Sequence, residues 1–541
     1  FASIGMGYWS GAGTALCRSE DGGDTWTIVS AIDYSTYQGW YSHGVGMHPD
    51  DPDEIICYGI ELWKSTTGGT ALEQKTESIN VHGTPDPGGP EGPPDYVHVD
   101  MHALEYHPHS PDTFYIATDG GVFRSLDRGE TFQACNGGYQ TTQFYNGFSS
   151  AATDSQLAMG GFQDNYSAIY SGSVAWRRVL YGDGCWTAIN PTDPDILFGS
   201  SQWLGGLYKS VDGGANWATV AGNLSGTSCF VTPFMLCNSD PDVMYAGFSY
   251  IYRSDDAGHS WHKTNNNLEL DGNPALSLAA SWYNSDVVYA GTAPSYTRAG
   301  LFRTTNGGES WVNITGELPD RYPVDIAVDP ANHSNVYVVF SGFGTSHIYN
   351  STDGGESWQD IGGSLPDVPT SAVIVDPWYT DHIYVGNDLG VYVSRDGGGS
   401  WMSLQEGLPD AIIAMDLSIS PTNRKLRVAT HGNGAYQMPL LNPTGVEQEQ
   451  QTVPANFELF QNYPNPFNAT TTISYRTSEA GMVHLAVYNV AGQLVEALVD
   501  EYKEAGRQTV KWDAKNVASA IYLYRLTAGE HTLARKCVIV R

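Results

Sequence analysis

Short apolar runs separated by polar turns make up the first 440 residues of the chain. In stretches such as Asn335–Val339 and His382–Gly386, β-branched and aromatic residues gather in runs bounded by Asp, Asn, Gly or Pro. Such runs are typical of β-strands and are too short for ordinary helices. With 61 Gly, 28 Pro and 12% aromatic residues, the composition agrees with turn-rich β structure. The pattern predicts an all-β chain of many short strands.

One turn sequence recurs along this part of the chain. It reads approximately S-x-D-x-G-x-[ST]-W, as in Ser351–Trp358. A second recurring turn, rich in Pro and Asp, precedes an apolar strand, as in His48–Ile55. Four strands in each period of about 45 residues are the signature of a β-propeller blade. The acidic or amide residue of the first turn recurs at Asp21, Asp127, Asp212, Asp256, Asn306, Asp353 and Asp396.

We interpret these seven residues as structural. A short carboxylate in a tight turn accepts hydrogen bonds from nearby backbone N–H groups, and glycine permits the positive φ that such turns need. A catalytic acid is needed at one place, whereas this position recurs seven times, six times as Asp and once as Asn.

The repeated unit resembles the Asp-box repeat of sialidases, sortilin-type receptors and xyloglucan-cleaving endoglucanases. The resemblance covers residues 1–441 and implies a large β-propeller of about nine or ten four-stranded blades, with the box on the blade periphery. An alternative is that the blades are parts of two seven-bladed rings, as in the endoglucanases. The sialidase activity itself is disfavoured, because the Arg-Ile-Pro signature of that family is absent.

The composition changes after Leu441. Residues 442–456 are polar, have no apolar period and are expected to form a linker. Residues 457–541 alternate in short strands and predict a small antiparallel, Ig-like β-sandwich. The segments "QNYPNPFN", "YNVAGQLV" and "IYLYRL" resemble the C-terminal sorting domain of the type IX secretion system. The resemblance implies export by that machinery, to the surface or surroundings of a Bacteroidota-like bacterium.

The charge balance limits the classes of partner that we expect this protein to bind. The chain has 26 Lys and Arg against 59 Asp and Glu, a formal net charge of −33. Such a surface repels phosphate, so we expect no nucleic-acid partner. No apolar stretch reaches the length of a membrane span. The chain begins at Phe1 without a leader, so we expect a processed or incomplete N-terminus. Among seven cysteines, Cys229 and Cys237 are close enough in sequence for a local disulfide.

The unrepeated polar residues are the candidates for chemistry. In Tyr96–Tyr106, alternation along a strand places His98, Asp100 and His102 on one face. Two imidazoles and a carboxylate suit a divalent metal such as zinc, and the acid-rich turn that begins at His48 suits calcium. The structural alternative for these histidines stays open.

Carboxylates form a second set of candidates. Asp119 precedes Gly-Gly after a strand, and xyloglucanase-type endoglucanases have a similar strand near their channel. Asp183 and Asp164 are candidate partners, because glycoside hydrolysis needs two carboxylates. The Asp-Gly-Gly sequence is also ordinary turn chemistry, and Asp388 lies in a similar segment.

Two classes of function therefore remain. The chain is either an extracellular binding or structural module for protein or polysaccharide, or a glycoside hydrolase acting on a neutral β-glucan. We slightly favour the binding module. Aromatic and amide side chains in loop-like segments are the candidate ligand contacts: Trp40, Tyr41, Gln163, Trp186 and Trp203.

Overall fold

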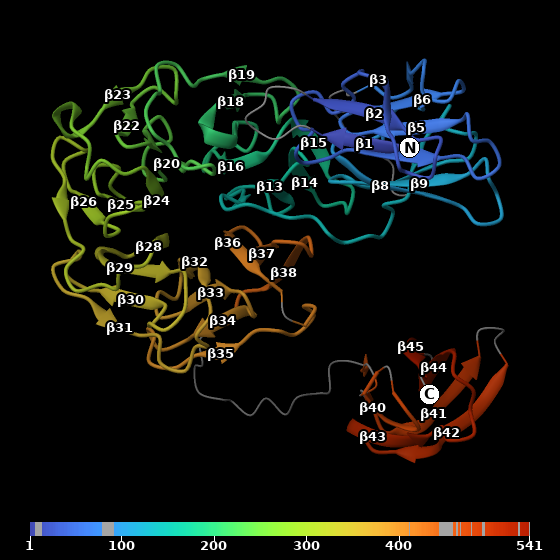
Figure 1. Cartoon of the computed structure of the whole chain (residues 1–541). Helices are drawn as coiled ribbons and strands as arrows, with labels where there is room; N and C mark the ends of the chain where they lie inside the picture. The colour runs from blue at the N-terminus through green and yellow to red at the C-terminus, as the bar shows by residue number, and fades with distance from the viewer. Residues whose placement is uncertain are drawn as a thin grey trace. The chain divides into compact units, whose positions relative to one another are not determined.

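A computed structural model shows two compact units, Phe1–Leu441 and Asn442–Arg541 (Figure 1). Of the predicted linker, residues 442–456, only Asn442 lies among the described residues. The structure describes residues 1–5, 13–77, 91–410, 412–442, 458–460, 462, 464–465, 467–477, 479–489, 493–528 and 531–539.

The described part of the first unit contains ten antiparallel sheets, and the first three of them follow one another as neighbours. We call these three the N-terminal array. Its strands are β1 (Ala2–Gly5), β2 (Thr14–Arg18) and β3 (Thr27–Ser30); β4 (Gly44–Met47), β5 (Ile55–Tyr58), β6 (Leu62–Ser65) and β7 (Glu73–Gln74); and β8 (Met101–Tyr106), β9 (Phe114–Thr118), β10 (Gly121–Ser125) and β11 (Gln133–Ala134).

The other seven sheets form a closed ring, because β36 of the last sheet lies beside β12 of the first (Figure 1). The first four sheets of the ring are β12 (Ser149–Ser150), β13 (Leu157–Gly161), β14 (Ser167–Ser171) and β15 (Arg177–Leu180); β16 (Gly184–Ile189), β17 (Leu197–Ser201), β18 (Leu207–Ser210) and β19 (Ala218–Thr219); β20 (Phe234–Leu236), β21 (Met244–Gly247), β22 (Ile251–Ser254) and β23 (His262–Lys263); and β24 (Ala275–Ala280), β25 (Val288–Thr292), β26 (Leu301–Thr304) and β27 (Val312–Asn313).

The ring continues through three further sheets, and two single-turn 3₁₀ helices, η1 (Gln202–Leu204) and η2 (Asn265–Asn267), lie in its loops. The strands of these sheets are β28 (Pro323–Asp329), β29 (Asn332–Phe340), β30 (Ile348–Ser351) and β31 (Gln359–Asp360); β32 (Thr370–Val375), β33 (Ile383–Asn387), β34 (Gly390–Ser394) and β35 (Met402–Ser403); and β36 (Ala414–Ser420), β37 (Lys425–Thr430) and β38 (Ala435–Pro439).

The all-β propeller fold is thus confirmed, and ten blade-like sheets agree with the expected nine or ten. Their arrangement differs from ten blades around one axis. Seven sheets close on themselves and three precede them, so the alternative of two rings, one of them partial, describes the arrangement better.

Burial on both faces explains why the sequences of the inner strands are runs of apolar residues more than strict alternations of apolar and polar residues. All five residues of β33 are buried, because neighbouring blades cover both faces of this strand. Both residues of the outermost strand of the same blade, β35, are exposed. Inner strands therefore carry the core between blades, and short outer strands carry polar residues.

The ring is closed by hydrogen bonds between its first and last blades. The Oδ2 atom of Asp416, on β36, accepts the backbone N–H groups of Gly147 (2.6 Å) and Phe148 (2.7 Å). Arg427, on β37, donates to Ser150 Oγ (2.9 Å) and to the carbonyl of Ser155 (2.7 Å). These bonds hold the start of the ring against its end.

The seven recurring turns share one hydrogen-bond pattern. In the fourth copy, Asp256 accepts Ser254 Oγ–H (2.8 Å), the Ser260 N–H (2.8 Å) and the Ser260 Oγ–H (2.6 Å). These donors lower the pKa of Asp256 to about 2. The other six residues are bonded within their turns in the same way: Asp21, Asp127, Asp212, Asn306, Asp353 and Asp396.

The second unit is a two-sheet sandwich, as expected for the small domain. Its buried core includes Trp512, Tyr524 and Leu485. One sheet has the order β39 (Glu458–Leu459), β40 (Thr470–Thr477) and β43 (Gly506–Asp513); the other has the order β42 (Leu494–Lys503), β41 (Gly481–Asn489), β44 (Ile521–Ala528) and β45 (His531–Val538).

Two further expectations are settled by the described residues. All seven cysteines are free, so the disulfide considered between Cys229 and Cys237 is wrong. Over the described ranges, no helix has the length and apolar character needed to cross a membrane.

We predict that Asp416→Ala lowers the free energy of unfolding of the ring by about 2–4 kcal/mol. The reason is that two buried N–H groups, of Gly147 and Phe148, lose their acceptor, and an unpaired buried donor costs roughly 1–3 kcal/mol. The measurement is denaturant unfolding of the full chain, with Asp410→Ala, at an exposed position, as the control. Equal midpoints for the two variants would contradict the closure.

We predict a smaller effect in the recurring turns. Asp256→Ala costs about 1 kcal/mol, as for the loss of a capping side chain, and Asp256→Asn costs less because Asn306 fills the same position with its amide bonded to Ser310 Oγ. Because the pKa of Asp256 is lowered, this contribution is present above about pH 4 and is lost as the pH falls toward 2. Melting temperatures of the variants at pH 7 and pH 2.5 test both statements; an Ala–Asp difference that is the same at both pH values would refute the second.

Candidate functional site

Four carboxylates meet where the N-terminal array adjoins the ring. Asp119 lies in the turn between β9 and β10, and Asp100 directly precedes β8. From the ring, Asp164 lies in the turn between β13 and β14, and Asp183 directly precedes β16. We call these four residues the carboxylate cluster. The structure thus brings together three residues predicted as catalytic and one predicted as a metal ligand.

Hydrogen bonds across the junction fix the two sides of the cluster. His98 Nε2 lies 2.9 Å from the carbonyl oxygen of Asp164, and Asn165 Nδ2 donates to the carbonyl of Asp119 (3.1 Å). Arg178 Nη2, from β15, donates to the carbonyl of Glu91 (2.7 Å) in the N-terminal array. The array and the ring are therefore bonded to each other directly beside the carboxylates.

Asp119 is held by two side chains of the N-terminal array. Its Oδ2 accepts the Tyr41 hydroxyl (2.8 Å), and its Oδ1 lies 2.8 Å from His102 Nε2. The rings of Tyr41 and His102 pack edge to face with centroids 5.0 Å apart. The contacts orient the carboxylate, and burial, followed by the hydrogen bond to Asp119, raises the pKa of Tyr41.

The pKa of Asp164 is shifted by its burial and by the other three carboxylates. Burial, followed by the charges of Asp183, Asp119 and Asp100, raises the pKa of Asp164 to about 6. A hydrogen bond from the Gln163 side chain opposes part of this shift. The backbone of Asp164 has a φ of 56°, and its N–H donates to Asp183 Oδ1 (3.1 Å). Asp164 is thus a carboxyl group that takes up a proton close to neutral pH.

The remaining two carboxylates are bonded to uncharged side chains. Gln38 Nε2 donates to Asp100 Oδ1, and burial, followed by the charge of Asp119, raises the pKa of Asp100. The Tyr145 hydroxyl lies 3.4 Å from Asp183 Oδ1. In the described part of the chain, no Lys or Arg forms an ion pair with any of the four carboxylates. Among the described residues, the nearby groups that can carry positive charge are therefore the histidines His98 and His102.

Aromatic rings flank the cluster on both sides. On the array side, Trp40 packs on Tyr41 with centroids 5.5 Å apart. On the ring side, Tyr145 contacts Phe230 (5.8 Å), which contacts Trp203 (5.3 Å). Trp40 and Trp203 are about half exposed, at 50% and 55%. The predicted ligand contacts Trp40, Tyr41 and Trp203 therefore lie along the cluster.

The other two predicted ligand contacts differ in position. Gln163 is adjacent to Asp164 and bonds to its carboxylate. Trp186, on β16, is partly buried and packs against the core between two blades of the ring. Gly147 lies against its ring, so closely that a side chain at Gly147 would collide with it. Trp186 thus contributes to packing between blades.

The geometry assumed for a metal site at His98, Asp100 and His102 is wrong. Asp100 has a φ of 60°, which breaks the strand alternation, and β8 begins only at Met101. Both ring nitrogens of His98 face carbonyl oxygens, of Val99 and Asp164, so no lone pair is directed at a shared centre. Across the described ranges, no three His, Cys, Asp or Glu residues are arranged to hold a metal ion. The same finding applies to the acid-rich turn that begins at His48, which was suggested as a calcium site.

Sequence reasoning missed Tyr145, Phe230 and Gln38. Tyr145 lies in the segment Thr141–Phe148, which is polar and aromatic and belongs to neither of the repeats beside it. This departure from the repeat is the signal in the sequence that could have identified Tyr145. Phe230 and Gln38 lie in loops whose position depends on contacts between distant segments.

The comparisons with known proteins bear on the two units separately. Residues 461–540 match the family model of the secretion system C-terminal sorting domain. The C-terminal unit is therefore a secretion sorting domain. The protein is exported by the type IX system of a Bacteroidota bacterium and is extracellular or bound to the cell surface.

A curated xyloglucanase of Hypocrea jecorina is 25% identical over 160 residues, which are 30% of this chain and 16% of that protein. This chain therefore spans a small part of that relative. Two solved structures are similar at low identity. PorZ, described as an essential surface component of the type IX secretion system of Porphyromonas gingivalis, is 14% identical, with 98% of this chain and 79% of PorZ covered and a TM-score of 0.42. The GH74 enzyme of Niastella koreensis is 13% identical, with 90% and 91% covered and a TM-score of 0.29.

We predict that Asp183→Asn lowers the pKa of Asp164. The substitution removes the largest of the neighbouring charges that raise this pKa, so the carboxyl should titrate closer to its ordinary value. Infrared difference titration of the full chain, with Asp164→Asn used to assign the band, measures the shift. Asp410→Asn should leave it unchanged. An Asp164 that titrates near 4 in the unmodified protein would show that the cluster does not perturb it.

Proposed function

We propose that this protein is an extracellular glycoside hydrolase that cleaves a neutral β-glucan. The observation that carries the proposal is the pKa of Asp164, which burial and the neighbouring carboxylates raise to about 6 beside Asp119. Glycoside hydrolysis uses two carboxyl groups whose environments separate their roles. One must be protonated at the working pH, and the other acts as a charged base or nucleophile.

Each group has a distinct role in this proposal. Asp164 donates its proton to the glycosidic oxygen as the bond to the leaving sugar breaks. Asp119, oriented by Tyr41 and His102, either activates a water molecule or attacks the anomeric carbon. Asp183 keeps the pKa of Asp164 high through its charge and binds its backbone N–H. The cluster is built from both parts of the first unit, so each part supplies one reacting group.

The surroundings of the cluster favour an uncharged polysaccharide. Four carboxylates without a paired Lys or Arg in the described residues would repel an anionic chain. Aromatic rings at Trp40, Tyr41 and Trp203 offer faces on which sugar rings stack. These features agree with a β-glucan backbone made of neutral sugars.

A second function, polysaccharide or protein binding without cleavage, is favoured by one observation. The backbone of Asp164 is bonded on both sides, through its N–H to Asp183 and through its carbonyl to His98. Such bonding is also what a structural turn requires. In that case the aromatic rings bind a partner, and the carboxylates have a structural role at the junction between the N-terminal array and the ring.

We predict release of reducing ends from at least one neutral β-glucan, xyloglucan included, by the purified chain. Asp119→Asn and Asp164→Asn should each lower kcat by about 10²–10⁴-fold, because each removes a proton-transfer or nucleophilic group. The activity should fall as the pH rises through about 6, since the acid form of Asp164 is then lost.

The chain offers a matched control. Asp388 lies in the turn between β33 and β34, the counterpart in the ring of the turn that holds Asp119. Asp388→Asn should leave kcat unchanged. No release from any β-glucan by a folded protein, together with retention of polysaccharide on the column-bound chain, would establish the binding function instead.

A further inference from the structure

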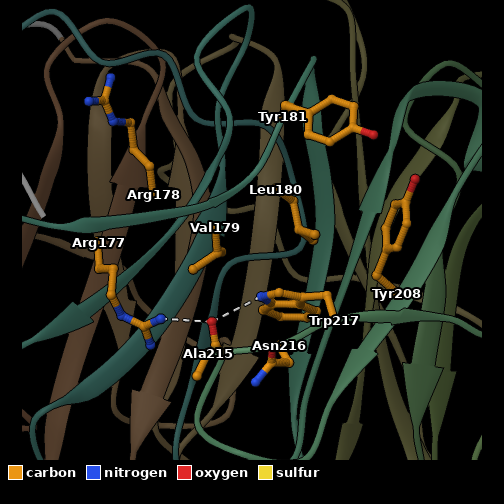
Figure 2. A pocket seen from close by; sticks show the side chains of 10 residues that line it. Arg177, Arg178, Val179, Leu180, Tyr181, Tyr208, Ala215, Asn216 and Trp217 are labelled. Atoms are coloured by element: carbon orange, nitrogen blue, oxygen red, sulfur yellow. Dashed lines mark hydrogen bonds between the residues drawn. The ribbon is translucent and has the colours of Figure 1, made fainter. Parts of the chain in front are cut away.

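A groove opens at the outer rim of the ring between its first two blades. One wall is β15 with the following Tyr181, and the other is Tyr208 on β18 together with the turn Gly214–Trp217. We call it the rim groove (Figure 2). Its volume is about 590 Å³, within the range of pockets that hold small-molecule ligands.

The groove exists because one contact between blades is missing at this junction. Elsewhere in the ring, the tryptophan of the recurring turn donates its indole N–H to the preceding blade, as Trp358 does to the carbonyl of Ile314 (2.8 Å). Trp217 donates to Gly214 of its own turn (3.1 Å). The other tryptophans that reach the preceding blade are Trp261, Trp311 and Trp401.

A contact that recurs in the ring, as from Arg303 to the carbonyl of Gly354, is made at this junction by Arg177. Its guanidinium group donates to the carbonyl oxygens of Gly213 and Gly214, at 2.7 Å for Gly214. Figure 2 shows Arg177 reaching this turn from the β15 side, with the indole of Trp217 directed at the same carbonyl. The indole ring of Trp217 therefore lines the groove, whereas its counterparts in the ring bond to the preceding blade.

The lining suits a sugar ring. Three aromatic side chains, Tyr181, Tyr208 and Trp217, supply faces and edges, and Tyr181 is 53% exposed. Asn216 replaces the Ser or Thr found in the other turns. One N–H of its amide is taken up by Asp212 Oδ2 (2.7 Å), which leaves the amide oxygen and the second N–H as the polar groups that it offers to the groove. Aromatic faces with a few convergent polar groups are what saccharide recognition requires.

The two arginines do not make this an anion site. The guanidinium of Arg177 is directed at carbonyl oxygens. Arg178 donates to the carbonyl of Glu91 and lies over the ring of Tyr166, 5.5 Å from its centroid. In Figure 2 its side chain points away from the tyrosines and Trp217. A neutral ligand fits better than an acidic one.

We propose that the rim groove is a non-catalytic binding site for a neutral saccharide. The choice of sugar rests on the proposed function, whereas binding itself does not depend on cleavage. β15 ends at Leu180, and Asp183 follows three residues later, a span of at most about 10 Å. One end of the groove therefore lies near the carboxylate cluster, within reach of a single glucan chain.

The test is calorimetric binding of cellohexaose to the full chain, carried out with the unmodified protein and with Asp164→Asn. Tyr181→Ala should weaken binding about tenfold, because an aromatic stacking contact is lost. Asn216→Ser should also weaken it. This second substitution restores the residue of the other turns, where Ser357 Oγ bonds to Asp353, so the turn remains intact.

Tyr283→Ala, at a 78% exposed tyrosine elsewhere on the ring, is the matched control and should leave the affinity unchanged. Unchanged affinity in both groove variants would overturn the proposal, as would the absence of cellohexaose binding by the unmodified chain. A protein that binds through Tyr181 and Asn216 but cleaves nothing would retain this site and reject the hydrolase function, so the two failures are distinguishable.

Discussion

The structure depends on the bond that closes the ring. The carboxylate of Asp416 holds the N–H groups of Gly147 and Phe148, which lie 269 and 268 residues earlier in the chain. Side chains on other inner strands likewise bond to the backbone of the neighbouring blade. Asp325 accepts the N–H of Val373 (2.8 Å), and Ser277 donates to the carbonyl of Pro323 (2.6 Å). Burial raises the pKa of Asp416 and of Asp325. Raised values mean that ionising these buried carboxyl groups costs free energy, so the stability of the ring falls as the pH rises from about 4 through the folded pKa. The backbone N–H groups that they accept offset part of this cost.

Closure matters for function because it fixes the first blade of the ring. That blade carries Asp164, and the next begins directly after Asp183. The N-terminal array, bonded through His98 and Asn165, brings Asp119 to the same place. Two residues of the cluster, Asp100 and Asp164, have positive φ, a conformation that costs about 1–3 kcal/mol for a non-glycine residue. Like charges gathered at strained positions are unfavourable for folding, and this is typical of a site selected for chemistry.

Local patterns in the sequence were sufficient for much of the fold. The recurring turns and apolar runs predict blades because each blade is built from neighbouring segments, and the sandwich follows from its own strands. The closure of seven sheets and the pairing of Asp164 with Asp119 depend on contacts between distant segments, which no local pattern encodes. For the same reason, Tyr145 and Phe230 were missed. The metal site at His98 failed because strand alternation was assumed through Asp100, where the backbone leaves the strand.

The departures from the repeat are more informative than the repeat itself. The seven turn residues, from Asp21 to Asp396, are bonded within their own turns. By contrast, the carboxylate cluster and the rim groove both lie where one blade differs from its neighbours. The first blade of the ring ends in β15 without the recurring turn, which the last sheet, β36 to β38, also lacks, and it adjoins both sites. We therefore place function at this blade.

The most direct test is a crystal structure of the full chain carrying Asp164→Asn, soaked with a β-glucan oligosaccharide. We predict a glycosidic oxygen within hydrogen-bonding distance of residue 164, with Asp119 facing the anomeric carbon or a water molecule beside it. An oligosaccharide bound away from both carboxylates, or a junction filled by side chains with no room for a sugar, would contradict it.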